Sequence, residues 1–350
     1  MQLRTRLIVF LLVLTCLVSG ATARYNLLVS SGEAMTLSAL GFLATLSPEQ
    51  KAKASLEYDN PARVDWHFIP KPARKGLQIR EMGSEQRQAA QALLKSCLSD
   101  IGYGKATKII ALEALLKVLE AEKVGGQIRD TERYFVTLFG APANDGKWGL
   151  SFEGHHLSLN FVVEKNKVVA FSPLALCTNP AKVMSAGVAS IPKGQRVLAA
   201  EEDLALELMA SLSDEQQKSV VIHEKAFAEV RTPGSAQPPQ EAAVGLAFDK
   251  LNAAQQKILS KLVETYLANL PEDVAAIRSR MLETEGWKSV HFAWAGSVKP
   301  GEGAYYRIQG QTFVIEYVNT QPDAAGNPAN HIHCIWRDMR GDFAIPMKKT

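Results

Sequence analysis

Four of the seven histidines in this 350-residue chain fall in two short segments. One segment reads GHHLSLNF (154–161), and the other reads NHIHCIWRD (330–338). Residues two apart on a β-strand point to the same face, so an HxH pair presents both imidazoles to one side. Two imidazoles at this spacing can bind one metal ion. The sequence therefore predicts a metal site, and its candidate histidine ligands are His155, His156, His331 and His333.

The alternation of residues in the first segment separates its two histidines. A strand over these residues puts His156 on the polar face with Ser158 and Asn160, and puts His155 on the apolar face. We therefore expect His156 to be the better ligand. Three imidazoles, with or without a carboxylate, suit zinc or copper, whereas two with a carboxylate suit non-haem iron. We expect a divalent ion, with zinc favoured and copper or iron left open.

A third segment, QTFVIEYVN (311–319), adds a carboxylate among apolar residues. A buried carboxylate needs a cation or a strong set of hydrogen bonds. We expect Glu316 to be a further ligand or a general base, with an ion pair to Arg307 or Arg337 as the alternative. Arg337 lies on the strand face of the HxH pair. It is expected either to stabilise a developing oxyanion or to form a structural ion pair.

Motifs that the chain lacks narrow the choice of reaction. It has no GxSxG elbow, glycine-rich phosphate loop, HExxH helix or paired CxxC, which argues against common hydrolase, nucleotide-binding and zincin classes. The candidate ligands favour a metal-dependent hydrolase acting on a small molecule or a peptide, because an exported compartment favours zinc over a labile ferrous ion. Two alternatives stay open: a non-catalytic metal or small-ligand binding protein, and a copper or iron oxidoreductase.

One basic cluster has two interpretations. Lys71, Arg74 and Lys75 lie in an irregular, proline-containing segment over residues 66–76. They could contact an anionic group of a substrate, or they could belong to a solvated loop.

The start of the chain reads as a cleavable secretory signal peptide. Arg4 and Arg6 precede an apolar run over residues 7–18, and Ala21-Thr22-Ala23 offers small residues for cleavage. We expect residues 1–23 to be removed and the protein to be secreted or periplasmic. No later stretch approaches the roughly 20 apolar residues of a transmembrane helix, so no membrane span is expected.

The composition of the chain bears on nucleic-acid binding, on the size of the core and on disulfide bonds. A formal net charge of +3 offers no broad basic face, so nucleic acid is not an expected partner. Apolar residues make up 47% of the chain, enough for a large core. Cys97, Cys177 and Cys334 follow the leader, and three cysteines do not make a disulfide framework.

Two groups of elements must position these side chains. In each group, helices come first along the chain and strands follow. Period-2 alternation predicts strands over residues 148–163 and again between residues 289 and 318. Residues 130–138 are expected to form a helix or turn, and residues 232–241 a hinge or a long surface loop. The fold class is therefore α+β, with helical layers packed on antiparallel sheet. Capped helix starts with a nearby glutamine occur at Ser47, Ser84, Ser213 and Asn252.

A spacing echo links the two parts of the chain. Gly140, Gly154 and Phe161 are followed 156 residues later by Gly296, Gly310 and Tyr317. This predicts two helix-plus-sheet halves, residues 24–200 and 201–350, that form one central pocket. The alternative is that similar strand patterns arose by chance.

Several long motifs carry a resemblance to a known family. They include DWHFIPKPARKGL, RDTERYFVTLFG, WGLSFEGHH, YRIQGQTFVIEYVNTQ and NHIHCIWRD. Through them the chain resembles a group of largely bacterial exported proteins, domain-of-unknown-function family 3500. The resemblance covers most of the chain after the leader and supports the histidine clustering, but it implies no particular reaction. Cys334 beside HIH and the ending GDFAIP depart from the family's pattern.

Overall fold

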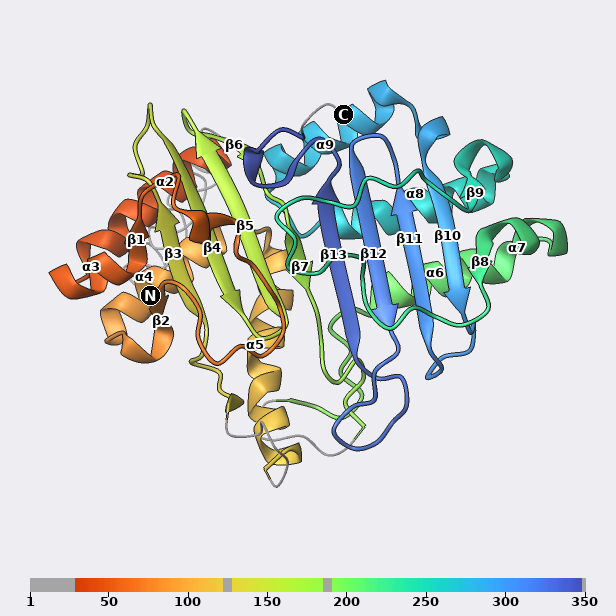
Figure 1. Ribbon diagram of the computed structural model, residues 1–350, viewed down its shortest axis with the longest axis horizontal. Helices are drawn as coiled ribbons and strands as arrows, with labels where there is room; N and C mark the ends of the chain where they lie inside the picture. Colours follow the sequence, from red (N-terminus) through yellow and green to blue (C-terminus); the bar gives the residue numbers. More distant parts are fainter. Residues whose placement is uncertain (1–28, 122–127, 185–190, 348–350) are drawn as a thin grey trace, which may run out of the picture.

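One mostly antiparallel sheet runs through the part of the chain that the structure describes, residues 29–121, 128–184 and 191–347. In this computed structural model the sheet has 13 strands, and its main path is β1-β3-β4-β5-β7-β13-β12-β11-β10-β8. Helices pack behind the sheet, and long irregular segments cross in front of it (Figure 1). The α+β architecture predicted from the sequence is confirmed. The expected signal peptide lies outside the described residues.

The first half of the sheet comes from the N-terminal part of the chain. Its strands are β1 (Ser55–Leu56), β2 (Leu77–Gln78), β3 (Phe135–Phe139), β4 (Lys147–Gly154), β5 (Leu157–Glu164), β6 (Lys167–Ala170) and β7 (Leu174–Leu176). Its helices are α2 (Ser31–Ala44), α3 (Pro48–Ala54), α4 (Ser84–Ser96) and α5 (Asp100–Leu119), with 3-10 turns η1 (Pro61–Val64) and η2 (Ile79–Glu81).

The second half follows the same order of elements. Its strands are β8 (Val221–His223), β9 (Leu246–Ala247), β10 (His291–Gly296), β11 (Ala304–Gln309), β12 (Phe313–Asn319) and β13 (Ile332–Asp338). Its helices are α6 (Ala199–Ser211), α7 (Asp214–Val220), α8 (Ala253–Leu267) and α9 (Glu272–Glu285), with 3-10 turns η4 (Phe248–Lys250), η5 (Trp287–Ser289) and η6 (Asp342–Ala344). None of the helices in the described ranges is long and apolar enough to cross a membrane.

The strand pairing repeats between the halves. β1 pairs parallel and β2 antiparallel with β3, and β8 and β9 pair in the same two ways with β10. Gly76 and Gly245 precede β2 and β9 with φ of +93° and +92°, and a Cβ at either would strike the neighbouring strand at Val136 or Phe292. The two edges of the sheet therefore share one pattern of strand pairing. Because β7 pairs with β13, the sheet continues unbroken from one half into the other.

Paired glutamines join the helices in each half. Gln50 and Gln86, in the first turns of α3 and α4, donate amide hydrogens to each other over 3.0 and 2.6 Å. Gln216 and Gln255 form the same reciprocal pair between α7 and α8, at 3.0 Å in both directions. Each of these glutamines also accepts a hydrogen bond from the backbone amide of its own N-cap residue. The capped starts at Ser47, Ser213 and Asn252 thus connect helices as well as starting them. The expected cap at Ser84 is wrong by one residue, because the N-cap of α4 is Gly83, which has no side chain to accept a hydrogen bond.

One expectation about local structure is wrong, and another had left two alternatives open. The sequence predicts a helix or turn over residues 130–138, but Phe135–Phe139 form β3, whose residues are buried on both faces. Aromatic and β-branched residues favour such a strand, and burial on both faces removes the alternation that would have indicated it. Residues 232–241 form a long loop packed on the molecule rather than a hinge, since the Ser235 carbonyl accepts hydrogen bonds from the side chains of Trp66 and Arg337, both at 2.8 Å.

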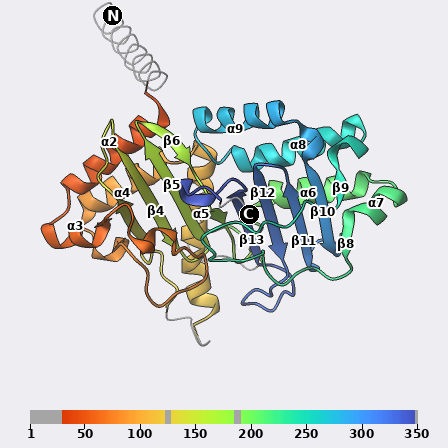
Figure 2. The same cartoon turned by 45° about the horizontal axis from the view of Figure 1, so that its top comes forward.

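The sheet has an apolar core on each face. The larger core lies between the sheet and the helices and includes Ile332, Cys334 and Trp336. The smaller core lies under the irregular segments and includes Phe68 and Ile335. The predicted alternation of β13 therefore holds, and His333 and Arg337 point to the face of the smaller core. Figure 2 shows the segment after β13 returning across the first half, where the Phe343 amide donates to the Ser172 carbonyl over 2.9 Å.

Candidate metal centre

His155 and His156 form the two-residue turn between β4 and β5, called here the histidine turn. Gly154 and Leu157 are the last paired residues of the hairpin, and His156 takes a left-handed φ of 61°, a region in which histidine is enriched. The sequence expectation that these residues lie on opposite faces of a strand is wrong, because the strand ends before them. Their rings instead lie against each other at a tilt of 32°, with centroids 3.6 Å apart.

Three imidazoles from distant parts of the chain meet at one point, and we call His156, His331 and His333 the histidine triad. Nε2 of His331 lies 2.8 Å from Nε2 of His156 and 3.0 Å from Nε2 of His333. The candidate ligand atoms of all three lie within 4.8 Å of one another. The structure thus brings together the two histidine segments, 175 residues apart, as the proposed shared ion requires.

These short contacts fit a metal ion better than a hydrogen-bond network. A neutral imidazole Nε2 carries either one hydrogen or one lone pair. Nε2 of His331 can therefore satisfy only one of its two contacts well. Around a tetrahedral zinc with Zn–N bonds of about 2.0–2.1 Å, neighbouring nitrogens lie ~3.3 Å apart. The two distances from Nε2 of His331, 2.8 and 3.0 Å, lie somewhat below that value. A shared cation would satisfy all three lone pairs.

Burial keeps triad imidazoles in the form that binds metal. His156 and His333 are 3% and 4% exposed, and His331 is partly exposed. Burial lowers the pKa of His331 to about 2, with His333 adding to the shift. Burial, together with the neighbouring histidines, holds the pKa of His156 well below its ordinary value. Both side chains are therefore neutral near pH 7, as a metal ligand must be.

Glu229 orients His333 from the irregular segment after β8. Both of its carboxylate oxygens lie 2.8 Å from Nδ1 of His333. The carboxylate accepts the Nδ1 hydrogen, which leaves the lone pair on Nε2 facing the triad. Glu229 cannot be recognised from the sequence, because it lies 104 residues from His333 in a segment without periodicity.

A second cluster adjoins the triad and is less suited to a cation. Glu113, His155 and His156 also bring candidate ligand atoms within 4.8 Å, and Glu113 is hydrogen-bonded to Nδ1 of His155. However, Nη1 of Arg129 lies 2.7 Å from the same nitrogen, and its charge opposes a second cation there. Burial raises the pKa of Glu113 to about 8, against the attraction of Arg129. His155 thus lies beside the triad in a polar cluster of its own.

A small cavity adjoins this second cluster. Its volume is about 10 Å³ and its lining includes Glu113, His155 and Arg74, enough room for about one water molecule. Glu113 was not a candidate at the sequence level, because it lies within the helical pattern of α5.

The structure does not bring Glu316 to the triad. Its buried carboxylate accepts hydrogen bonds from the Tyr305 hydroxyl at 2.7 Å and from Nε of Arg231 at 3.1 Å. Arg307 lies opposite Glu316 in the strand register, but the ion pair is made with Arg231. Among the described residues, neither group of candidate ligands includes Glu316. The geometry therefore favours the structural alternative.

Arg337 is likewise held in internal contacts. It forms a buried ion pair with Asp342 and donates from Nη2 to the Ser235 carbonyl. Its guanidinium also lies 5.1 Å from the centre of the Trp66 ring. Arg337 was expected either to stabilise an oxyanion or to form a structural ion pair. The structure favours the ion pair, which Arg337 makes with Asp342.

Comparison with known proteins agrees with the resemblance seen in the sequence. A family model described as "Protein of unknown function (DUF3500)" matches residues 30–345. No curated protein and no solved structure matches the chain. The matched residues contain the whole triad, Glu229 and Glu113.

Proposed function

Because the chain belongs to the DUF3500 family, whose description assigns no activity, we propose a function from its own site: a metal-dependent hydrolase. His156, His331 and His333 would hold a divalent ion. The observation that carries this proposal is the convergence of three Nε2 atoms, in which His331 contacts both of its partners at 3.0 Å or less.

The number of ligands supports catalysis over a purely structural ion. Structural zinc sites usually have four protein ligands, whereas catalytic sites have three and leave one position open. Within the described residues, the triad has three members. Its one partly exposed member, His331, gives the open position a route to solvent.

The residues around the triad have roles that suit hydrolysis. A bound divalent ion supplies a Lewis acid and lowers the pKa of its water. Glu229 holds His333 in the required tautomer. Glu113 and His155 share a hydrogen bond beside His156, and they are the candidates for general acid–base catalysis. We propose a small-molecule or peptide substrate, a secreted or periplasmic location, and zinc as the favoured ion.

Metal analysis of untagged protein tests the proposal directly. The wild-type protein should contain about one equivalent of a divalent metal, and the double variant His331→Ala/His333→Ala should contain none. The matched control is His223→Ala, because His223 is exposed on the edge strand β8 and its loss should leave the metal in place. A double variant that keeps its metal would overturn the site.

The same material separates the alternative functions. Bound zinc with hydrolysis of model esters or peptides supports the proposal. Bound metal with a closed coordination shell and no hydrolysis indicates a binding protein. A visible absorption band from a redox-active ion indicates an oxidoreductase that uses copper or iron.

A further inference from the structure

The irregular segment over residues 65–76 touches two of the three triad ligands through one residue, Phe68. The Phe68 carbonyl accepts the backbone N–H of His156 at 2.7 Å. Its ring lies 4.7 Å from the ring of His333. Phe68 is fully buried in the smaller core. The position of this one residue therefore affects ligands from both halves of the molecule.

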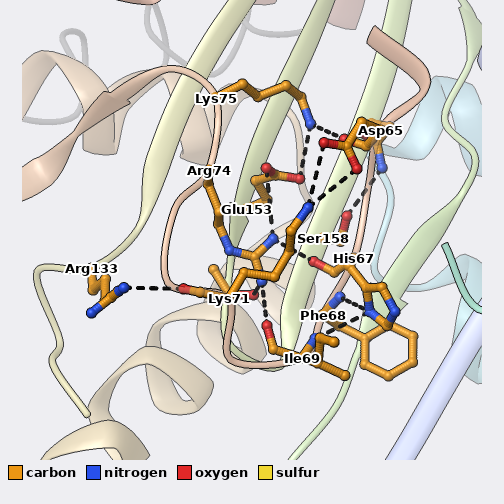
Figure 3. A network of polar contacts seen from close by, with 12 residues as sticks. Asp65, His67, Phe68, Ile69, Lys71, Arg74, Lys75, Arg133, Glu153 and Ser158 are labelled. Carbon is orange, nitrogen blue, oxygen red and sulfur yellow. Dashed lines mark hydrogen bonds and ion pairs between the residues drawn. The ribbon is translucent and has the colours of Figure 1, made fainter. Parts of the chain in front are cut away.

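Arg74 fixes the backbone on both sides of Phe68 (Figure 3). Its Nη1 donates to the His67 carbonyl at 2.7 Å, and its Nη2 donates to the Ile69 carbonyl at 2.5 Å. Nη2 also lies 3.2 Å from the carbonyl of Gly154, the residue directly before the histidine turn. One planar guanidinium, with several donors in a fixed geometry, thus ties the segment to the turn.

The charges that accompany Arg74 are buried. The side chains of Arg74 and Glu153 are each 2% exposed, and they form an ion pair at 3.6 Å. Lys75 pairs with the other oxygen of Glu153 at 3.1 Å, so two cations share one carboxylate (Figure 3). The expectation of a solvated loop is therefore wrong for Arg74 and Lys75. Buried ion pairs add little net stability compared with apolar packing, but they can fix one arrangement of the chain.

The buried network of Arg74, Lys75 and Glu153 has no charged counterpart at the corresponding positions of the second half. Gly76 corresponds to Gly245, so Arg74 and Lys75 correspond to Ala243 and Val244, which carry no charge. The turn that corresponds to His155 and His156 is Gln311-Thr312, between β11 and β12. The basic network is thus present in the half whose turn carries histidines and is replaced by apolar residues in the other.

We propose that Arg74 is a positioning residue of the metal centre. It holds Phe68 against the histidine turn and against His333, and so fixes the relative placement of ligands from the two halves. This inference rests on the proposed metal site.

Arg74→Lys tests the proposal because it keeps the charge but cannot span the three carbonyls. Zinc affinity, measured by competition with a chelator, should fall by about 10–100-fold, the effect typical of losing a residue that orients a ligand. The absorption spectrum of the Co²⁺-substituted protein should also change, because it reports ligand geometry. The matched control is Lys71→Met on the same segment, since Lys71 pairs with an Asp65 side chain that is 62% exposed.

The melting temperature of the metal-free variant distinguishes positioning from general stabilisation. A folded Arg74→Lys variant with wild-type zinc affinity and Co²⁺ spectrum would overturn the inference, whatever its melting temperature. If Arg74→Lys does not fold, Glu153→Gln replaces it and should weaken zinc binding several-fold; unchanged binding in that variant would also overturn the inference. A wild-type protein that binds neither Zn²⁺ nor Co²⁺ would refute the metal site itself, which is a separate outcome.

Discussion

At the scale of single residues, the proposed metal binding depends on which nitrogen of each histidine faces the ion. His333 has a carboxylate on Nδ1, so its tautomer is fixed by Glu229. His156 is held instead through its backbone, by the carbonyl of Phe68 and the amide of Cys177. The orientation of His333 should therefore respond to a change of charge at Glu229. That of His156 should respond to a shift of the neighbouring main chain.

Glu229→Gln should weaken zinc binding by about 10–100-fold, because a neutral amide is a poorer acceptor for the Nδ1 hydrogen and lowers the basicity of the ligand. Competition with a chelator measures the change. Glu241→Gln is the control, since Glu241 lies on the same irregular segment and its side chain, 65% exposed, pairs with Arg231. Equal zinc affinities in the two variants would show that Glu229 does not orient a ligand.

At this scale, side chains in regular structure can be placed from the sequence, whereas those in irregular segments cannot. Alternation placed His333 on the correct face of β13, because a strand repeats every two residues. Glu229 lies in an irregular segment, where no period exists to reveal its direction. For Glu316 the sequence left two roles open, a place at the ion or an ion pair with Arg307 or Arg337, because a buried carboxylate requires a cation. The sequence alone does not show that Arg231 supplies this cation.

At the scale of elements, the paired glutamines make the clearest test of how the helices are held. Gln255 is buried; it donates to the Ser211 carbonyl at 2.8 Å and accepts from the Asn252 amide at 2.9 Å. It also exchanges hydrogen bonds with Gln216. Several polar groups therefore depend on this one amide.

Gln255→Ala should lower the free energy of unfolding by about 1–3 kcal/mol, because it leaves buried polar groups without partners. Urea unfolding measures the loss. Gln91→Ala on α4 is the control, since Gln91 is exposed and alanine is the better helix former. A change in Gln255→Ala no larger than that in the control would mean that water replaces the lost contacts.

The same elements show what the sequence could reveal. The capped helix starts were visible because capping requires particular residue types at fixed spacing. The sequence did not reveal that these glutamines pair with each other. The partners in each pair lie 36 or 39 residues apart in the chain. β3 was missed for the opposite reason, since its burial on both faces hides the period.

At the scale of the whole molecule, the proposed metal centre lies where the two halves of the sheet meet. His156 comes from the turn of the hairpin β4–β5, His333 from the start of β13, and His331 from the residue directly before that strand. Each half also sends one irregular segment to the triad, with Phe68 from the first and Glu229 from the second. The repeat itself was only faintly visible in the sequence. Its strands are offset by 156 residues, but Gln50 and Gln216 are offset by 166, so no single shift aligns both helices and strands.

This placement predicts that the ion stabilises both halves together. Binding to the folded state alone at a free zinc concentration 100 times Kd should raise the free energy of unfolding by about 2.7 kcal/mol. Because β7 and β13 join the halves in one sheet, hydrogen exchange should slow in β4–β5 and in β12–β13 by the same factor. His331→Ala should abolish the effect in both regions. Protection confined to one hairpin would show that the ion does not bridge the repeats, since a ligand shared by two cooperative units must stabilise each of them.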